Sequence, residues 1–499
     1  MLVDLIVVAA YLSLAIWGGR RLAHRRSTLR DYYLTGRRLP WWAVMGSIVA
    51  TETSTITVIS VPGYAFGGDL TFLQLALGYV VGRVFVAVVL LPAYFSRDLL
   101  TAYQLLAARL GRAFGQCAAV VFLLTRNVAD GLRLFATALV LAAMLATAAD
   151  TVGLAGLAQG TAVVAAILII AAVTLAYTWV GGMAAVVWMD VIQLGIYLCG
   201  ALAAAAMLLG GLPEGGREAV AAAQAAGKLD MFDFAWDLRR DYTFWSGVFG
   251  GAVSIAAIHG TDQMFVQRYL CTRSLADARL ALIASGIFVF FQFAAFLGIG
   301  VLLWSFYAAG ESQALAAITV DGAVQSDRVF PLFLMTHLPA GLRGLLLAAV
   351  VAAAMSTLSS SLNSSAASTV GDFFLAGRAR SEKQALRASR WATGAWAAVQ
   401  VGVAIAAMGI SQRVIDDVLA VQFFSGGLML GVFLLSVLLA RPTPGAGIAG
   451  LAGGLITIVT VSLLTDLSWQ WYVLVGSAAT LGAGCAAHRM RWAGLGVRG

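Results

Sequence analysis

Long apolar runs separated by short polar stretches make up most of this 499-residue chain. Thirteen of the runs reach the roughly 20 residues that a helix needs to cross the apolar core of a bilayer. They lie near residues 2–19, 41–66, 70–96, 113–146, 159–180, 184–209, 242–262, 278–307, 340–370, 388–409, 417–440, 445–464 and 469–487. The pattern therefore predicts an all-α integral membrane protein with about 13 transmembrane helices.

Composition agrees with this prediction, because 61% of the residues are hydrophobic and only 11% are charged. Soluble domains carry roughly 25% charged residues. The four cysteines are scattered and form no C-x-x-C pair, which favours neither a disulfide framework nor a zinc site. The chain has no Walker loop, no H-E-x-x-H and no G-x-S-x-G motif. We therefore expect neither an enzyme nor an ATP-driven pump, and no cofactor.

The net charge of +8 is explained by the positive-inside rule and needs no nucleic-acid partner. The segment 20–38 holds seven arginines against one acid, a second basic cluster spans 378–390, and 210–242 holds more acids than bases. These segments predict a multi-pass protein of the cell membrane, with its N-terminus outside and its C-terminus cytoplasmic. This threading assigns further basic residues to cytoplasmic loops, namely Arg97, Arg109, Arg112, Arg268, Arg273, Arg279 and Arg441.

The stretch 50–57, A-T-E-T-S-T-I-T, interrupts the second apolar run with five hydroxyl side chains and the carboxylate of Glu52. A carboxylate at mid-membrane depth costs several kcal/mol, roughly 2.5–3.5 on insertion scales. One interpretation is a polar contact between helices, with the hydroxyls bonded to the preceding turn. The other is a discontinuous helix whose freed carbonyls bind a cation and whose side chains line a solute cavity.

The seventh run shows a similar interruption, with glycines 247, 250 and 251 followed by the polar run H-G-T-D-Q. The glycines also fit as contact points between helices. Two interrupted runs five helices apart are typical of an inverted repeat of five plus five helices. The expected organisation is therefore an extra helix with a basic loop (1–40), a first repeat (41–209), an extracellular loop (210–241), a second repeat (242–440) and two additional helices with a tail (441–499).

Polar side chains also recur along the ninth run, A-A-A-M-S-T-L-S-S-S-L-N-S-S-A-A-S-T (352–369). Ser356, Ser359, Ser360, Asn363 and Ser364 share one helical face at three- and four-residue spacing. The stripe fits either the bonding of helices to each other or the coordination of a hard monovalent cation.

Asp190 opens the sixth run with no basic residue within a helical turn. An acid inside the membrane is a functional-site hypothesis by default, and the alternative is an interfacial acid that reaches cytoplasmic water.

Charged residues in other runs are predicted to pair. Arg126 and Asp130 are four residues apart, and Arg133 follows Asp130 by three. Arg133 therefore either shares that acid or offers its guanidinium to an anionic solute. Arg83 and Glu52 form a second possible pair across two runs.

Three further polar residues lie within apolar runs. His259 lies beside the interruption of the seventh run and is either a packing histidine or a cavity residue. Gln74 and Gln422 carry amides that are costly unless bonded, and they serve either packing or a solute.

With these residues in place, the chain resembles the sodium/solute symporter family, which includes sodium–glucose symporters, proline permease and the bacterial sialic acid symporter. The likeness covers roughly residues 30–440. The matching stretches, besides the ninth-run serines, are D-Y-Y-L-T-G-R-R (31–38), P-G-Y-A-F-G-G-D (62–69), Y-T-W-V-G-G-M-A-A-V-V-W-M-D-V-I-Q (177–193) and G-T-D-Q-M-F-V-Q-R-Y-L (260–270). The resemblance implies a LeuT-type inverted-repeat fold with discontinuous helices.

The resemblance also implies where sodium binds. A first sodium site would use backbone carbonyls of Ala50, Thr53 and Ala353 with the hydroxyls of Ser356 and Thr357. Some members have a second sodium site. Here its pattern falls on Asp190, Ser356, Ser359 and Ser360, so that two sodium ions per solute is a hypothesis.

The solute-binding positions of the family correspond here to Glu52, Ser54, Thr57, Gln74, Arg133, His259 and Gln422. An arginine and a carboxylate facing one cavity favour a solute that carries a carboxylate, such as an amino acid or a sugar acid. The expected function is therefore a sodium-coupled secondary active symporter that imports a small polar solute by alternating access, with sodium, the solute and membrane lipid as its partners. The alternatives are a symporter of sugars or other neutral polyols, a membrane sensor and a passive channel.

Overall fold

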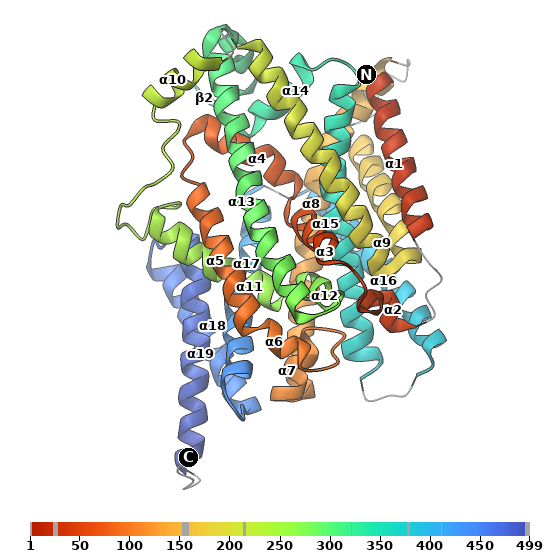
Figure 1. The fold of residues 1–499 in the computed structure, drawn as a ribbon, viewed down its shortest axis with the longest axis vertical. Helices are drawn as coiled ribbons and strands as arrows, with labels where there is room; N and C mark the ends of the chain where they lie inside the picture. The colour runs from red at the N-terminus through yellow and green to blue at the C-terminus, as the bar shows by residue number, and fades with distance from the viewer. Residues whose placement is uncertain are drawn as a thin grey trace.

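The computed structural model describes residues 2–22, 28–151, 159–212, 216–320, 322–376, 380–410 and 412–494, and it is almost entirely helical. Most helices run along the long axis of the molecule, and the loop elements α10, β2 and α14 gather at one end (Figure 1). The first half of the chain forms α1 (Leu2–Leu22), α2 (Leu29–Leu34), α3 (Trp41–Glu52), α4 (Thr55–Gly67), α5 (Leu73–Val89), α6 (Leu91–Phe95), α7 (Tyr103–Leu110), α8 (Arg112–Thr151), α9 (Gln159–Gly211) and α10 (Arg217–Ala225). The second half forms α11 (Gly251–Thr261), α12 (Gln263–Leu270), α13 (Leu275–Phe306), α14 (Val329–His337), α15 (Leu342–Ser368), α16 (Glu382–Ala407), α17 (Gln412–Leu438), α18 (Pro444–Leu464) and α19 (Trp469–Gly494).

Short elements connect or extend these helices. The only strands in the described residues are β1 (Thr319–Val320) and β2 (Ala323–Val324), which pair antiparallel in a small hairpin. The remaining elements are the 3₁₀ or π turns η1 (Thr35–Arg37), η3 (Ser246–Gly250), η4 (Tyr307–Glu311), η5 (Ser312–Ile318), η6 (Ser326–Arg328) and η7 (Thr369–Phe374).

Six helices of the described chain are long and apolar enough to cross a bilayer, and a seventh span is gained if α3 and α4 count as one bent span. Several membrane-spanning helices make this a multi-pass membrane protein, but the number found among the described residues does not test the prediction of thirteen transmembrane helices. Helix α9 shows why the two numbers differ. Its 53 residues would measure about 80 Å as one rod, far more than the roughly 30 Å of the bilayer core, and it covers two of the predicted runs.

The two halves of α9 meet at Gly182, whose backbone (φ 55°, ψ −152°) is not helical. This conformation is essentially restricted to glycine. The kink frees carbonyls in the preceding turn, and the Tyr32 hydroxyl of α2 donates to Thr178 O at 3.3 Å and Trp179 O at 3.1 Å. A Cβ on Gly182 would lie 2.5 Å from Tyr32 O, so glycine also permits the close approach of α2.

The predicted discontinuity in the second run is confirmed. Helix α3 ends at Glu52, Thr53 and Ser54 are extended, and α4 continues at a bend of 64°. The helical ladder stops with Thr53 N–H donating to Val49 O at 3.0 Å. Ser54 N–H donates instead to Thr57 Oγ1 at 3.4 Å, and the Ser54 hydroxyl accepts from Thr57 N–H at 3.3 Å. This capping box explains why a threonine-rich stretch starts a new helix here. The polar contact between helices, the other interpretation, does not account for this break, although the Thr53 hydroxyl does donate to Val49 O of the preceding turn at 2.8 Å.

The seventh run also breaks, but at a different residue from its glycines. The backbone of Asp262 is extended (φ −79°, ψ 123°), and its side chain caps α12 by accepting from Met264 N–H at 2.8 Å. Gly247 and Gly250 lie instead in continuous helical structure, where an added Cβ would meet Gln74 at 2.9 Å and Gln470 at 2.6 Å. The glycines are contact points, and the acid of H-G-T-D-Q breaks the helix.

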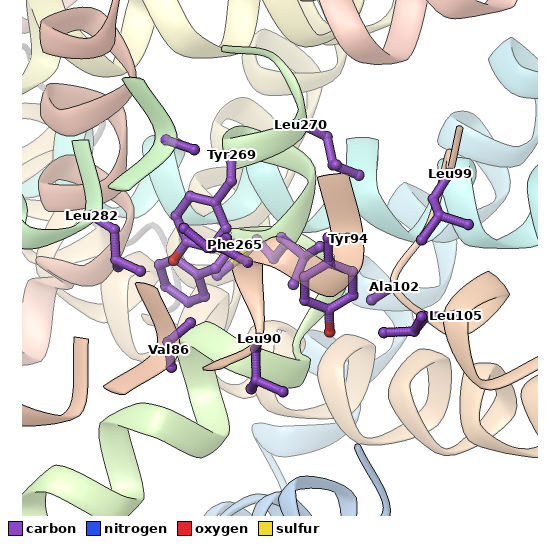
Figure 2. Packing of buried hydrophobic residues seen from close by; sticks show 14 of the residues in the cluster. Val86, Leu90, Tyr94, Leu99, Ala102, Leu105, Phe265, Tyr269, Leu270 and Leu282 are labelled. Carbon is purple, nitrogen blue, oxygen red and sulfur yellow. The ribbon is translucent and has the colours of Figure 1, made fainter. Parts of the chain in front are cut away.

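Helix α12 is packed into a large hydrophobic core in the half of the molecule away from α10, on the side of α6 and α7 (Figure 1). Figure 2 shows Phe265 and Tyr269 lying near Val86 and Leu282. In the same cluster Tyr94 lies near Ala102 and Leu105, and its hydroxyl donates to Gly260 O at 2.6 Å. The chain is therefore tightly packed below the two helix breaks.

Candidate solute and cation sites

A cavity of about 750 Å³ lies at the break between α3 and α4. Its wall includes Thr51, Glu52, Ser54 and Thr57, and it extends to Asp327, which follows β2 at the loop-bearing end of the molecule. This volume is typical of small-molecule sites. The broken helix therefore borders a space large enough for a small organic solute.

Glu52 lines the cavity and also belongs to a buried network of charged side chains. It pairs with Arg83 of α5, which is fully buried, so the predicted pair is confirmed. His259 Nε2 lies 3.6 Å from Glu52 Oε2 and 3.3 Å from Arg83 Nη2. His259 Nδ1 lies 2.5 Å from the Tyr269 hydroxyl. The second carboxylate oxygen, Glu52 Oε1, is buried without a hydrogen-bond partner among the described residues.

Two arginines of α8, Arg126 and Arg133, also line the cavity. Arg126 Nε donates to Asp130 Oδ2 at 2.7 Å, and Arg133 Nη1 donates to Asp130 Oδ1 at 2.6 Å, so both predicted contacts are confirmed. Arg126 also reaches Asp262, the helix-breaking residue, at 3.3 Å. The side chain of Arg133 is 27% exposed, against 6% for Arg126, which makes Arg133 the more accessible of the two guanidinium groups.

The other predicted solute residues have different positions. Ser54 and Thr57 line the cavity, although their hydroxyls also cap α4. Gln74 is fully buried, where its amide donates to Thr71 O and Tyr242 O and accepts from Asp233 N–H. His259 is likewise buried behind Glu52. The side chain of Gln422 lies outside the described part of the chain.

The residues predicted for the first sodium site lie at the C-terminal end of α3 and on α15, two helices that contact each other. Ala50, Thr53, Ala353, Ser356 and Thr357 are all buried. The Thr357 hydroxyl donates to Thr51 O at 3.2 Å, and the Ser356 hydroxyl donates to Asp190 Oδ1 at 2.6 Å. Each hydroxyl thus gives its hydrogen to another oxygen and keeps lone pairs that a cation can use.

Asp190 is not an interfacial acid open to water, since it is fully buried and bonded on both oxygens. The expectation that Arg268 lies in a cytoplasmic loop is wrong. Arg268 belongs to α12, is fully buried and pairs with Asp190 at 3.0 Å. An arginine can be buried in this way because a carboxylate and several hydroxyls replace its hydration.

The hydroxyl groups of α15 bond this helix to its neighbours, as one of the two interpretations predicted, and the coordination of a cation stays a prediction. Toward α3 and α9, Ser356 and Ser360 surround Asp190 and Arg268. On the other side Ser361 accepts from Gln400 at 2.9 Å and Ser365 accepts from Asn127 at 2.9 Å, so these hydroxyls bond α15 to α16 and α8. Ser359 and Ser364 bond back to carbonyls of their own helix.

Sequence reasoning missed several residues of the site. Arg126, Tyr79, Phe72 and Phe293 line the cavity, and Arg268 bonds to Asp190 of the predicted second sodium site. The sequence did contain a signal for Arg268. The residue lies in the family-like run 260–270, soon after the polar interruption of the seventh run, so too few residues are available for a long loop between the two. The aromatic residues carried no such signal, since apolar side chains are expected throughout membrane helices.

Comparisons with known proteins agree with this geometry. A family model described as the sodium:solute symporter family matches residues 32–454. The human sodium/iodide cotransporter is 30% identical over 458 residues, which cover 90% of this chain and 67% of that protein. The sodium/sialic acid symporter SiaT of Proteus mirabilis (strain HI4320) is 26% identical over 502 residues, which cover 96% of this chain and 93% of that protein.

Solved structures extend the likeness to the whole fold. A Na⁺-coupled sialic acid symporter in a substrate-bound outward-open state, which reveals a novel Na⁺ site, superposes with a TM-score of 0.86. It is 26% identical, and the match covers 98% of both chains. The LeuT-like fold expected from the sequence is thereby shown. This chain is a member of the sodium:solute symporter family, a sodium-coupled solute symporter and not an enzyme.

Proposed function

We propose that this symporter imports a small solute bearing a carboxylate, together with sodium bound between the broken end of α3 and the middle of α15. The observation that carries the proposal is the cavity itself. It places an accessible arginine, a carboxylate with one unbonded oxygen and a helix break around one space of about 750 Å³.

The solute chemistry follows from Arg133 and Glu52. A guanidinium presents five N–H donors in a planar fork that suits a carboxylate, and the partly exposed Arg133 lines the cavity. Glu52 Oε1 is an acceptor that lacks a donor within the described residues, and an amino or hydroxyl group of the solute would supply one. An amino acid or a sugar acid carries both groups, whereas a neutral polyol would leave the arginine unused. The names of the relatives support an anion, since sialate and iodide are both negatively charged.

Sodium at the first site would join two helices from opposite halves of the chain. The carbonyls of Ala50 and Thr53 lie at the C-terminal end of α3, where the helix dipole favours a cation. Ala353, Ser356 and Thr357 lie on consecutive turns of α15. Sodium bound to both helices would favour the conformation with this geometry, and it would thereby couple ion binding to solute binding.

The same proposal includes the membrane orientation. The cavity extends toward the end that carries α10 and β2, while α2 and α7 lie at the other end (Figure 1). Basic residues gather at that other end, where Arg30 and Arg37 contact Asp98 and Arg112 contacts Ala376 O. By the positive-inside rule this end is cytoplasmic, which gives an external N-terminus and a cytoplasmic C-terminus. The division into two five-helix repeats at 41–209 and 242–440 is part of the same proposal and is supported by the two helix breaks.

A thermal-shift screen of the purified protein tests the solute class. Amino acids, sialate, pyruvate and neutral sugars are added separately in sodium chloride and in potassium chloride. A true solute at one hundred times its Kd stabilises the folded state by about 2.7 kcal/mol. We expect such shifts from a carboxylate-bearing compound in sodium only.

The variant Arg133→Lys tests the role of the guanidinium, because it keeps the positive charge beside Asp130 and removes the planar fork of N–H donors. Loss of a charged hydrogen bond of about 1.5–3 kcal/mol would weaken binding of the carboxylate compound by roughly 10-fold or more. A shift produced only by neutral sugars, or one that is equal in potassium, would contradict the proposal.

A further inference from the structure

The buried guanidinium of Arg268 bonds to two of the residues, Asp190 and Ser360, that the family resemblance implied for a second sodium ion. We propose that Arg268 is a tethered cation, which holds this second cation position in place of sodium, so that the protein binds one sodium ion and not two. The inference rests on the proposed sodium site between α3 and α15, and it concerns only the neighbouring position around Asp190.

Every nitrogen of the guanidinium has a partner in this position. Nη2 donates to Asp190 Oδ2 at 3.0 Å and also contacts the hydroxyls of Thr51 and Ser360. Nε donates to the Ser47 hydroxyl at 2.8 Å, and Nη1 donates to Met264 O at 2.5 Å. The group is therefore fully coordinated by a carboxylate, hydroxyls and a carbonyl, which are the oxygen types that a hard cation prefers.

Sodium and Arg268 exclude each other at this position for reasons of space and of charge. Nη2 bonds to Asp190 and Ser360, two of the four residues in the predicted second sodium site. Asp190 and Arg268 are both buried and neutralise each other. A sodium ion bound to the same oxygens of Asp190 and Ser360 would lie beside the guanidinium, and two positive charges this close together in a buried site repel each other strongly. Sodium can bind to Asp190 only after Arg268 has left.

The tethered charge also joins four helices. Arg268 comes from α12, just after the break at Asp262, and its partners lie on α3, the second half of α9 and α15. These contacts close the protein below the cavity, next to the hydrophobic core around Tyr269 (Figure 2). Opening of this end would require Arg268 to separate from Asp190, so we assign Arg268 a positioning role as well as a charge-balancing one.

Equilibrium binding of radioactive sodium to the purified protein, without solute, tests the inference directly. We expect one sodium ion per chain, bound with a single-site isotherm. The variant Arg268→Ala removes the tethered charge and leaves Asp190 with its hydroxyls, and it should bind two ions. Arg268→Lys is the matched control that keeps a tethered cation, and it should bind one. The double variant Arg268→Ala/Asp190→Asn should also return to one ion.

The possible failures are distinguishable. Two saturable sodium ions in the unmodified protein would overturn the inference while leaving the proposed function intact. A folded Arg268→Ala protein that still binds one ion would also overturn it. No saturable sodium in the unmodified protein would overturn the proposed function, together with the inference that rests on it. If Arg268→Ala does not fold, the number of sodium ions bound per chain of the unmodified protein decides whether the inference holds.

Discussion

At the scale of single residues, opposite charges are buried together around the cavity, some from one helix and some from different helices. Glu52 pairs with Arg83, Asp130 with Arg126 and Arg133, and Asp190 with Arg268. A buried charge without its partner is strongly destabilising, whereas an intact pair is nearly neutral in its contribution to folding. The pairs therefore allow charged side chains to be buried at membrane depth. Removal of either partner would leave the other as an unpaired buried charge.

A double-mutant cycle on Glu52 and Arg83 tests this dependence. Glu52→Gln and Arg83→Met should each lower the free energy of unfolding by about 3–5 kcal/mol, because each leaves one buried charge unpaired. The double variant should lose less than the sum, with a coupling of about 1–3 kcal/mol. Denaturant unfolding in detergent measures all three values. Ser462→Ala on the exposed face of α18 is the control, and it should be additive with either change.

At the scale of elements, the function depends on places where helices stop being regular. The breaks after Glu52 and at Asp262 put backbone ends and side chains beside the cavity, and the kink at Gly182 turns α9 back across the membrane. Each irregularity has a local solution for its freed backbone groups: a capping box at Ser54, a capping carboxylate at Asp262 and the Tyr32 hydroxyl at Gly182. Non-helical backbone within a membrane needs such partners, since lipid offers none.

Gly182→Ala should therefore destabilise the protein. Alanine in the observed conformation costs about 1–3 kcal/mol in backbone strain, and its Cβ would lie 2.5 Å from Tyr32 O. Gly195→Ala in the same helix is the matched control, because nothing lies within 4 Å of the added Cβ. We expect thermal unfolding of the first variant several degrees below that of the second. Equal melting temperatures would show that α2 and the kink adjust without cost.

At the scale of the whole molecule, the structure is open toward the α10 end and closed at the other. The cavity extends to Asp327 near β2, while Arg268 and the core around α12 fill the space on the opposite side. This asymmetry is that of an outward-facing transporter in the proposed orientation. Alternating access then requires α12 to separate from α3, α9 and α15 when sodium and solute leave.

Hydrogen–deuterium exchange tests this requirement. Sodium should slow exchange of peptides from α12 relative to potassium, by roughly 5-fold or more if the coupling between the cation and the closed end exceeds about 1 kcal/mol. Peptides from α18 are the control, because α18 packs mainly on α19, away from the proposed sodium site. Identical exchange rates of α12 peptides in both salts would show that sodium binding is not coupled to closure of this end.

The sequence by itself determined the class of protein and the contacts that are local in the chain. Apolar runs predict membrane helices because only such segments tolerate lipid. The break after Glu52 followed from hydroxyl-rich local sequence, and the contacts among Arg126, Asp130 and Arg133 followed from helical spacing of three and four residues. In each of these cases the physical cause lies within a few residues.

Tertiary structure alone decided the contacts between distant segments. Arg268 meets Asp190 across 78 positions, and Gln74 is held by Asp233 and Tyr242 far along the chain. It also decided which serines of α15 face Asp190 and which bond to α8 and α16. Spacing along one helix defines a face, but only the packing of other helices determines what that face meets, because the partners of a buried polar group come from whichever segments the fold brings beside it.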